Sequence, residues 1–419
     1  AYAHSREGSM RIRSLRYALI FVAAATVACS SRVSEPTPGM YRAELALPGG
    51  ATPIGLEVAK EQERYVLYLS NGSERSRVPN VRVENSELIA VFPGYENSLR
   101  ASMRRDALDG TITLIKAGGK EQVIPFKAQL GQTHRFYADA ATVNTDVAGR
   151  WEATFTSDEG QTSKAVAVLE QQRDRVTGTV MTPTGDHRFL EGQVRGDELQ
   201  LSTFAGGLAY LYRLKLNPAG EFEGDYWQGL AEHVKVVARR NDAATLAGAG
   251  PQTTLKSEKF DFTFADADGK PVSLSDERFR GKVVVVTLGG SWCPNCHDEA
   301  AFLTPFYREY RDKGFEIIAL MFERHGAFEK AASAVRGYRN DLGIEFTTLI
   351  AGLSETGQAS EALPSLSGIY GFPTTIFVDK KGVVRDIHVG FSGPATGKYY
   401  EEHVAAFRSQ VDSLLAEVL

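Results

Sequence analysis

The feature that most constrains the fold is a pair of cysteines placed where a buried strand meets a helix. Residues 283–288 form an unbroken apolar run, which is typical of a central strand covered on both faces. After a short turn, Cys293 and Cys296 open a helix predicted over residues 293–313. A strand, a tight turn and a C-x-x-C helix in this order constrain the chain far more than C-x-x-C alone. They predict an α/β fold at this end of the chain.

The position of the pair at a helix start predicts its chemistry. Backbone amides and the helix dipole favour the thiolate over the thiol at Cys293. Residues three apart on a helix share a face, so Cys296 can attack a mixed disulfide formed on Cys293. We therefore expect a redox-active disulfide between these residues, with Cys293 as the attacking thiol and Cys296 as the resolving thiol, and no further cofactor.

Cysteine usage and net charge exclude several other classes of protein. The chain has only three cysteines in 419 residues, too few for a disulfide-stapled scaffold. No second pair of Cys or His follows Cys296 at the spacing of a four-ligand zinc site, so we expect no metal. The formal net charge of −5 provides no basic stripe for a phosphate backbone, so nucleic acid is not an expected partner.

A second motif, Gly-Phe-Pro-Thr-Thr at residues 371–375, directly precedes a predicted strand over residues 376–379. With the cysteine motif, it makes residues 259–419 resemble the thioredoxin superfamily, and specifically the TlpA-like (ResA-type) thiol:disulfide oxidoreductases. The resemblance implies that Pro373 is a cis-proline that faces the cysteine pair, and that the backbone around it holds the substrate chain. It implies substrate contacts for the residues that flank the two motifs: Trp292, Pro294, Asn295, Phe372 and Thr374.

Two departures from the family pattern matter for the chemistry. The family commonly has Pro directly before the second cysteine, where this chain has Asn295, so the reduction potential does not carry over. Thioredoxins have a buried Asp six residues before the first cysteine, where this chain has Thr287, and a threonine cannot accept a proton at neutral pH.

We therefore expect the proton acceptor to come from another strand. Glu323 ends a predicted central strand, and strand ends are where open α/β sheets place their sites. ResA-type proteins have a functional Glu in a similar place. Burial near the thiols would raise the pKa of Glu323 and suit it to acid–base work. The alternative is an exposed Glu323 paired with Arg324.

Three other functions remain open for the same residues. Cys-Pro-Asn-Cys-His also matches the attachment motif of c-type haem, but the preceding strand and the second motif favour a thioredoxin fold, with His297 on the helix surface. A peroxiredoxin would have Thr or Ser three residues before its reactive cysteine, where this chain has Gly290. The third alternative is a binding protein in which the region before the redox domain captures a ligand.

The region before residue 241 predicts a duplicated all-β module, either barrels or a sandwich. Short runs of alternating apolar and polar residues are separated by turn sequences, about eight strands in each of two copies, 39–140 and 149–240. Residues 241–258 read as a linker. Trp151, Tyr226 and Trp227 could line a ligand cavity, but such residues more often fill a barrel core, and we assign them no function. An offset of 110 residues aligns Gly39 with Gly149, Tyr41 with Trp151, Ala43 with Ala153, Gly50 with Gly160, Val58 with Val168, Gly110 with Gly220 and Ala128 with Ala238.

The first residues predict export and anchoring. Residues 1–9 lie upstream of Met10, and residues 10–28 combine arginines, a short apolar run and small residues, as in a secretory signal. With Cys29 next and a Pro-containing tether over 29–38, this segment resembles a bacterial lipoprotein signal, so we expect acylation of Cys29. The alternative is simple cleavage after Ala28. We expect a membrane-anchored, periplasm-facing lipoprotein that acts on disulfide-containing protein substrates and receives electrons from a membrane thiol donor.

Overall fold

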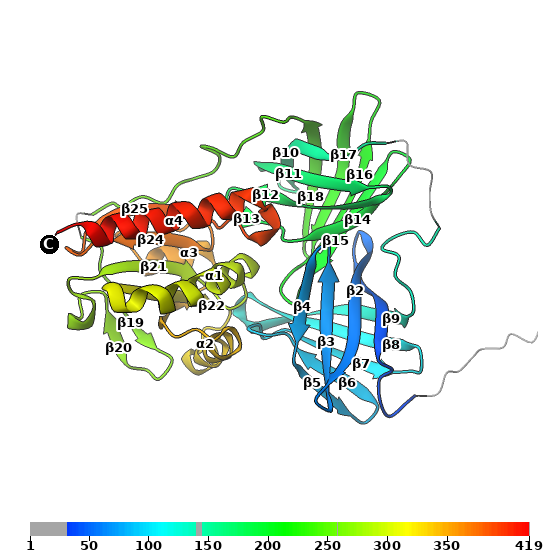
Figure 1. The fold of residues 1–419 in the computed structure, drawn as a ribbon, viewed down its shortest axis with the longest axis horizontal. Coiled ribbons are helices and arrows are strands. Elements are labelled where there is room, and N and C mark those ends of the chain that lie inside the picture. Colours follow the sequence, from blue (N-terminus) through cyan, green and yellow to red (C-terminus); the bar gives the residue numbers. More distant parts are fainter. Residues whose placement is uncertain (1–31, 140–144, 258, 419) are drawn as a thin grey trace, which may run out of the picture. The chain divides into compact units, whose positions relative to one another are not determined.

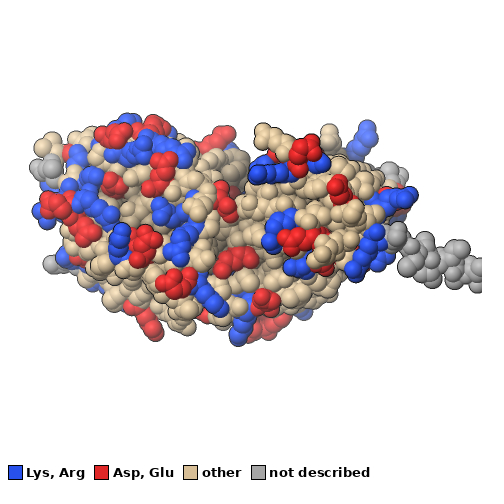
Figure 2. Space-filling model, turned by 90° about the horizontal axis from the view of Figure 1, so that it is seen from below, with Lys and Arg blue, Asp and Glu red and all other residues tan. Residues whose placement is uncertain are grey.

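The computed structural model describes residues 32–139, 145–257 and 259–418, all within one compact unit, Arg32–Leu419. Cys29 and the predicted signal over residues 10–28 lie outside the described residues. None of the described helices is long and apolar enough to cross a membrane. On the face shown in Figure 2, Lys and Arg alternate with Asp and Glu, and no extended patch of one sign is visible.

The C-terminal part is the expected thioredoxin-like α/β domain (Figure 1, yellow to red). Among the described residues its sheet has seven strands in the order β20-β19-β23-β22-β21-β24-β25. The central strand β21 runs parallel to β22 and antiparallel to β24. The strands are β19 (Thr263–Asp266), β20 (Pro271–Ser273), β21 (Val283–Gly289), β22 (Phe315–Glu323), β23 (Thr347–Leu353), β24 (Thr374–Val378) and β25 (Val384–Val389).

Both faces of this sheet are covered, which explains why all of β21 is apolar or small and buried. Val283 and Val285 pack with residues of α1, α2 and α4 on one face, whereas Val284 and Val286 pack with residues of α3 on the other. The helices are α1 (Pro294–Tyr310), α2 (Phe328–Leu342), α3 (Thr356–Ala362) and α4 (Lys398–Ala416). The predicted helix over 293–313 is thus shorter, because Cys293 is its N-cap and a 3₁₀ turn, Arg311–Lys313, follows it.

The N-terminal region forms two barrel-like sheets (Figure 1, blue to green). Of the two folds that the sequence left open, barrels and a sandwich, the structure therefore has barrels. Each has nine strands in the described part of the chain, against about eight expected. The first contains β1 (Gly39–Leu47), β2 (Gly50–Glu61), β3 (Arg64–Asn71), β4 (Glu74–Val78), β5 (Asn80–Glu84), β6 (Glu87–Val91), β7 (Ser98–Met103), β8 (Ala107–Lys116) and β9 (Lys120–Leu130).

The second sheet is closed by hydrogen bonds between β11 and β12 in addition to its other pairings. We call it the second barrel. Its strands are β10 (Gly149–Ser157), β11 (Thr162–Gln172), β12 (Arg175–Thr182), β13 (Gly185–Asp186), β14 (Leu190–Arg195), β15 (Glu198–Phe204), β16 (Ala209–Leu216), β17 (Glu221–Gln228) and β18 (Glu232–Arg240).

The strand registers agree with a duplication but correct more than one aligned pair. Gly39 faces Val58, whereas Gly149 faces Leu169, so the residue that matches Val58 is Leu169 and not Val168. Ala43 faces Ala128 in the first sheet, and Ala153 faces Ala238 in the second, as an offset of 110 requires. Gly110, however, faces Phe126, and the residue that faces the matching Val236 is Gly224. Gly224 therefore takes the place expected of Gly220, which lies in the turn before β17. The copies differ in length here, and a constant offset cannot follow such a change.

The segment between the second barrel and the α/β domain has no helix or strand among its described residues, 241–257. Its second half is nevertheless bound to the α/β domain. Thr253 Oγ1 donates to the carbonyl of Gly368 at 2.8 Å, and the backbone N–H of Lys256 donates to the carbonyl of Ser365 at 2.7 Å. Leu255 also forms an isolated bridge with Leu366.

Candidate active site around Cys293 and Cys296

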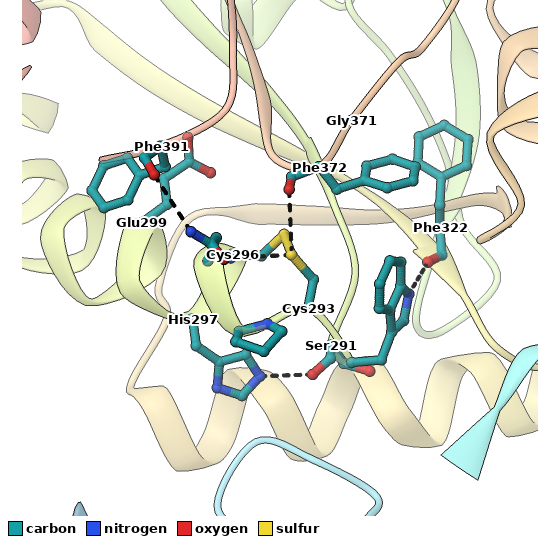
Figure 3. Close-up of a disulfide and its surroundings, with 12 residues drawn as sticks. Ser291, Cys293, Cys296, His297, Glu299, Phe322, Gly371, Phe372 and Phe391 are labelled. Atoms are coloured by element: carbon teal, nitrogen blue, oxygen red, sulfur yellow. Dashed lines mark hydrogen bonds between the residues drawn. A yellow bond between two sulfur atoms is a disulfide. The ribbon is translucent and has the colours of Figure 1, made fainter. Parts of the chain in front are cut away.

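Cys293 and Cys296 form a disulfide with their Cα atoms 5.2 Å apart (Figure 3). Cys293 is the N-cap of α1, and Pro294 takes the first helical position, where a missing N–H costs nothing. The backbone N–H of Cys296 donates to the Cys293 sulfur at 3.3 Å. When the disulfide is reduced, this N–H and the helix start favour a thiolate on Cys293.

The second motif lies directly beside the Cys293 sulfur. The peptide bond between Phe372 and Pro373 is cis, as the family resemblance implies. The carbonyl oxygen of Phe372 lies 3.6 Å from Cys293 Sγ (Figure 3). The indole N–H of Trp292 donates to the carbonyl of Phe322 at 2.8 Å, and the Trp292 ring meets the Phe372 ring edge to face at 5.8 Å. Trp292 and Phe372 therefore pack against each other beside the reactive sulfur.

Four of the five residues expected to contact substrate line one pocket with Cys293: Trp292, Pro294, Asn295 and Phe372. Thr374 does not line that pocket. It is fully buried, and its hydroxyl donates to the carbonyl of Gly371 at 2.8 Å. Thr374 therefore fixes the loop that holds Phe372 and has no surface for a substrate.

Glu323 is fully buried at the end of β22, so the alternative of an exposed side chain is wrong. Its two carboxyl oxygens accept hydrogen bonds from Ser291, one from the backbone N–H at 2.9 Å and one from the hydroxyl at 2.7 Å. Burial raises the pKa of Glu323 to about 7. Arg324 does not pair with it but stacks over the Trp292 ring, 3.9 Å from its centre.

A second buried carboxyl, Glu299, was missed in the sequence. Glu299 lies three residues after Cys296 on α1, and its carboxyl accepts hydrogen bonds from the hydroxyls of Thr287 at 2.5 Å and Thr375 at 2.7 Å. Burial raises the pKa of Glu299 to about 7. Thioredoxins have a buried Asp where this chain has Thr287. In this protein a carboxyl still lies beside that position, but it belongs to Glu299 on α1.

The Glu299 carboxyl and the Cys296 sulfur lie over the same face of β21. Residues two apart on a strand share a face, as Thr287 and Gly289 do. Glu299 contacts Thr287, and a Cβ atom added at Gly289 would come within 3.2 Å of the Cys296 sulfur. The two groups thus lie over neighbouring same-face positions of β21. The three-residue spacing from Cys296 was the signal that could have identified Glu299.

The interpretation of His297 as a helix-surface residue is wrong. His297 is only 8% exposed, its Nε2 lies 2.7 Å from the carbonyl oxygen of Ser291, and burial lowers its pKa to about 3. Its ring stacks on Tyr95 with centres 3.8 Å apart. Tyr95 lies in the loop between β6 and β7 of the first sheet, and the backbone N–H of Gly94 in the same loop donates to Asp341 at 2.8 Å. This distant loop covers the helix face that α1 alone would expose.

The second barrel also contacts the start of α1, through Arg188. Its guanidinium donates to Asp298 at 2.7 Å and to the carbonyl of Pro294, between the two cysteines, at 3.3 Å. It also pairs with Glu74 of the first sheet. We call Arg188, Glu74 and Asp298 the Arg188 cluster. All three side chains are largely buried, with exposures of 14%, 9% and 13%.

Comparisons with known proteins identify what this chain is similar to. The family model described as Redoxin matches residues 255–402, which include both cysteines and Pro373. The thiol-disulfide oxidoreductase ResA of Bacillus thuringiensis (strain Al Hakam) is 31% identical over 139 residues, which cover 32% of this chain and 70% of that protein. The thioredoxin-like protein YneN of Bacillus subtilis (strain 168) is 29% identical over 130 residues, which cover 31% of this chain and 68% of that protein. A solved structure, the thiol:disulfide interchange protein of the thioredoxin family from Chlorobium tepidum TLS, has a TM-score of 0.29 and 23% identity, with 38% of this chain and 97% of that chain covered.

Proposed function

This chain belongs to the ResA-like thiol-disulfide oxidoreductases, and from that premise we propose that it is an exported reductase of protein disulfides that works through the Cys293–Cys296 dithiol. The observation that supports the proposal best is the position of the Cys293 sulfur. It lies at the start of α1 and 3.6 Å from the carbonyl oxygen of Phe372, and it opens into a pocket.

In the proposed reaction, the Cys293 thiolate attacks one sulfur of a substrate disulfide. A bond forms between that sulfur and Cys293, the substrate disulfide breaks, and the other substrate sulfur leaves as a thiolate that takes up a proton. Cys296, once deprotonated, attacks the Cys293 sulfur and releases the first substrate sulfur as a second thiolate. The substrate gains two electrons and two protons, and the protein is left with the Cys293–Cys296 disulfide. A thiol donor at the membrane then reduces that disulfide.

Glu299 is the proton acceptor for Cys296 in this proposal, because it shares a helix face and a strand face with that residue. Glu323, for which we expected this role, is the second candidate. The described contacts of its carboxyl are with Ser291 in the loop before Cys293. We assign Glu323 to holding that loop, and substitution of each carboxyl separates the two roles.

Glu323→Gln is expected to stabilise the protein at high pH. The pKa of Glu323 is raised from 4.5 to about 7, so its contribution to stability is present below the unfolded pKa and is lost as the pH rises through about 7. Gln can keep both contacts with Ser291 if its oxygen accepts from the backbone N–H and its NH2 donates to the hydroxyl oxygen. The free energy of unfolding at pH 8 should therefore rise by about 2–3 kcal/mol, and the difference should shrink towards zero near about pH 4.

Urea unfolding at the two pH values measures this difference. The control is Glu170→Gln at an exposed site, which should change stability by less than about 0.5 kcal/mol at either pH. An equal gain at both pH values would contradict the raised pKa of Glu323. The rate of disulfide exchange should stay near that of the parent protein, and a large loss would transfer the proton-acceptor role from Glu299 to Glu323.

Export through the signal over residues 10–28 and acylation of Cys29 complete the proposal, with the enzyme facing the periplasm from a membrane. Both rest on the sequence of the first residues. Growth with a labelled fatty acid tests them. Label should appear in the parent protein and be absent from Cys29→Ala, and equal labelling of the two would contradict acylation at Cys29.

Substrate trapping tests the assigned roles of the two thiols. Cys296→Ser should accumulate a mixed disulfide between Cys293 and substrate, because the resolving thiol is absent. Cys293→Ser should accumulate none. Gel shifts under non-reducing conditions and mass spectrometry of the bound partner give the readout. Equal trapping by both variants would overturn the role assignment.

A further inference from the structure

The Cys293 sulfur opens into a pocket of about 940 Å³, near the upper end of the range for ligand sites. The second barrel forms most of its wall, and residues 248–251 and the active-site loops form the rest. The pocket therefore extends continuously from the disulfide to the open end of the second barrel. The disulfide of this protein therefore lies at the wall of a recessed pocket, and only 4% of Cys293 is exposed.

Tight contacts hold the second barrel over the active site. A Cβ atom added at Gly371, next to Phe372, would lie 2.4 Å from Thr184, which leaves no room for a larger residue there. The Asp186 carboxylate accepts a hydrogen bond from the backbone N–H of Gly393 at 2.7 Å. The side-chain amide of Asn295 faces the backbone of Asp186, with which it can exchange two hydrogen bonds of 3.1 and 2.8 Å. A folded protein surface cannot lie flat against Cys293, whereas a narrow segment of chain can enter.

Four aromatic residues of the second barrel line the pocket together, and we call them the aromatic end: Phe155, His187, Tyr210 and Tyr226. His187 stacks on Tyr210 with ring centres 4.6 Å apart, and Tyr226 lies 5.7 Å from Phe155 and 6.0 Å from Tyr210. Burial lowers the pKa of His187 to about 3, so the His187 ring is uncharged at neutral pH. Rings arranged in this way offer faces and edges to another aromatic side chain.

Hydrogen-bonding groups accompany the rings. The Tyr210 hydroxyl has no hydrogen-bond partner within the described residues. The Tyr226 hydroxyl donates to Gln228 at 3.1 Å, and Gln228 in turn donates to Glu232 at 2.6 Å. A polar backbone that enters beside the rings therefore finds both donors and acceptors.

The charges in the lining argue against a small, highly charged disulfide. The charged residues in the described lining are Lys164, which is exposed, Asp186, which is bound to Gly393, and Glu232, which is bound to Gln228. Among the described lining residues, no buried cation is present to hold free carboxylates. A polypeptide segment can pack an aromatic side chain against the rings and pair its uncharged backbone with the hydrogen-bonding groups. It thereby leaves no charge unpaired.

We propose that this pocket selects the substrate, and that it takes an extended, cysteine-bearing segment of polypeptide with an aromatic side chain a few residues from the cysteine. The cysteine disulfide lies beside Cys293 and the aromatic side chain binds at the aromatic end. The inference rests on the proposed function and names its substrate class. The exchange that follows is the one already described, with the dithiol as reductant.

The test uses the full chain, reduced with dithiothreitol and then freed of it. Two short uncharged peptides of equal length each carry one cysteine as a mixed disulfide with thionitrobenzoate, and they differ only in a Phe or a Ser near the cysteine. The Phe peptide should react with a kcat/KM about tenfold higher. Hydroxyethyl disulfide and glutathione disulfide serve as small probes, the first uncharged and the second charged.

Ser163→Trp fills the pocket without touching the thiols. Ser163 is exposed, lines the pocket and lies directly opposite Phe155 in the β10–β11 pair, so both side chains share a face. This variant should abolish the preference for the Phe peptide and leave the rate with hydroxyethyl disulfide unchanged. Val237→Trp adds the same bulk on β18 at an exposed site outside the pocket and should change neither rate.

Equal rates for the two peptides, or equal losses in Ser163→Trp and Val237→Trp, would overturn the pocket assignment and leave the exchange chemistry intact. A faster reaction with glutathione disulfide than with either peptide would overturn the substrate class. Failure to reduce hydroxyethyl disulfide as well as both peptides would overturn the proposed function itself, and this inference with it.

Discussion

Glu299→Gln is expected to slow the attack of Cys296 on a mixed disulfide by about 10²–10⁴-fold, the usual contribution of a positioned general base. The carboxyl lies on the same helix face as Cys296, and Thr287 and Thr375 fix its orientation. Gln keeps the size of the side chain and can still accept a hydrogen bond, but it cannot take a proton from the thiol. The loss should therefore appear in the resolving step, with little change in the first attack by Cys293.

The pH dependence of the same step gives a second readout. The pKa of Glu299 is raised to about 7, so in the parent protein the rate should rise as the pH increases through about 7 and the carboxyl becomes a base. In Glu299→Gln this rise should disappear and the rate should follow the thiol of Cys296 alone. Stopped-flow measurements on a preformed mixed disulfide test this. Glu309→Gln, at a half-exposed site on the same helix, is the control and should behave like the parent protein.

An unchanged resolving rate and an unchanged pH profile in Glu299→Gln would remove Glu299 from the mechanism. If the same loss appeared in Glu323→Gln instead, the expectation from sequence would be correct and Glu323 would be the acceptor.

Arg188→Met is expected to lower the free energy of unfolding by about 3–5 kcal/mol, because it leaves two buried carboxylates without their cation. Asp298 and Glu74 both contact the Arg188 guanidinium and are largely buried. The control is Arg175→Met in the same barrel. Arg175 is 46% exposed and pairs with Glu191, so its loss should cost less than about 1 kcal/mol.

Urea unfolding of the full chain measures both changes. A triple variant adds Glu74→Leu and Asp298→Leu to Arg188→Met, so that the whole Arg188 cluster is apolar. It should recover most of the lost stability, because no unpaired charge then remains buried. A loss below about 1 kcal/mol in Arg188→Met, or no recovery in the triple variant, would show that the cluster does not hold the second barrel on α1.

The parts of the fold that local sequence determines were predictable. An apolar run followed by C-x-x-C requires a buried strand and a helix start, and the structure has both at β21 and α1. Glu323 could be placed at a strand end for the same reason. The duplication was visible in the sequence as residues repeated at a fixed offset. Ala43 and Ala153, one such pair, occupy matching places in their sheets.

The remaining features depend on contacts between segments far apart in the chain. His297 is buried by Tyr95, about two hundred positions earlier, and Arg188 reaches Asp298 across 110 positions. Neither contact leaves a periodic pattern in the local sequence. Glu299 is a different case, because its spacing from Cys296 was visible but its partner Thr375 lies on another strand. The position of the second barrel over Cys293 follows only from the assembled structure.

A single turnover by the reduced full chain, with an excess of a peptide mixed disulfide, tests the dithiol chemistry of Cys293 and Cys296 directly. We expect that each chain reduces one disulfide, that peptide mapping by mass spectrometry then finds Cys293 joined to Cys296, and that Cys293→Ser reduces none. Reduction by Cys293→Ser at the parental rate, or turnover that leaves Cys293 and Cys296 as free thiols, would contradict this dithiol chemistry.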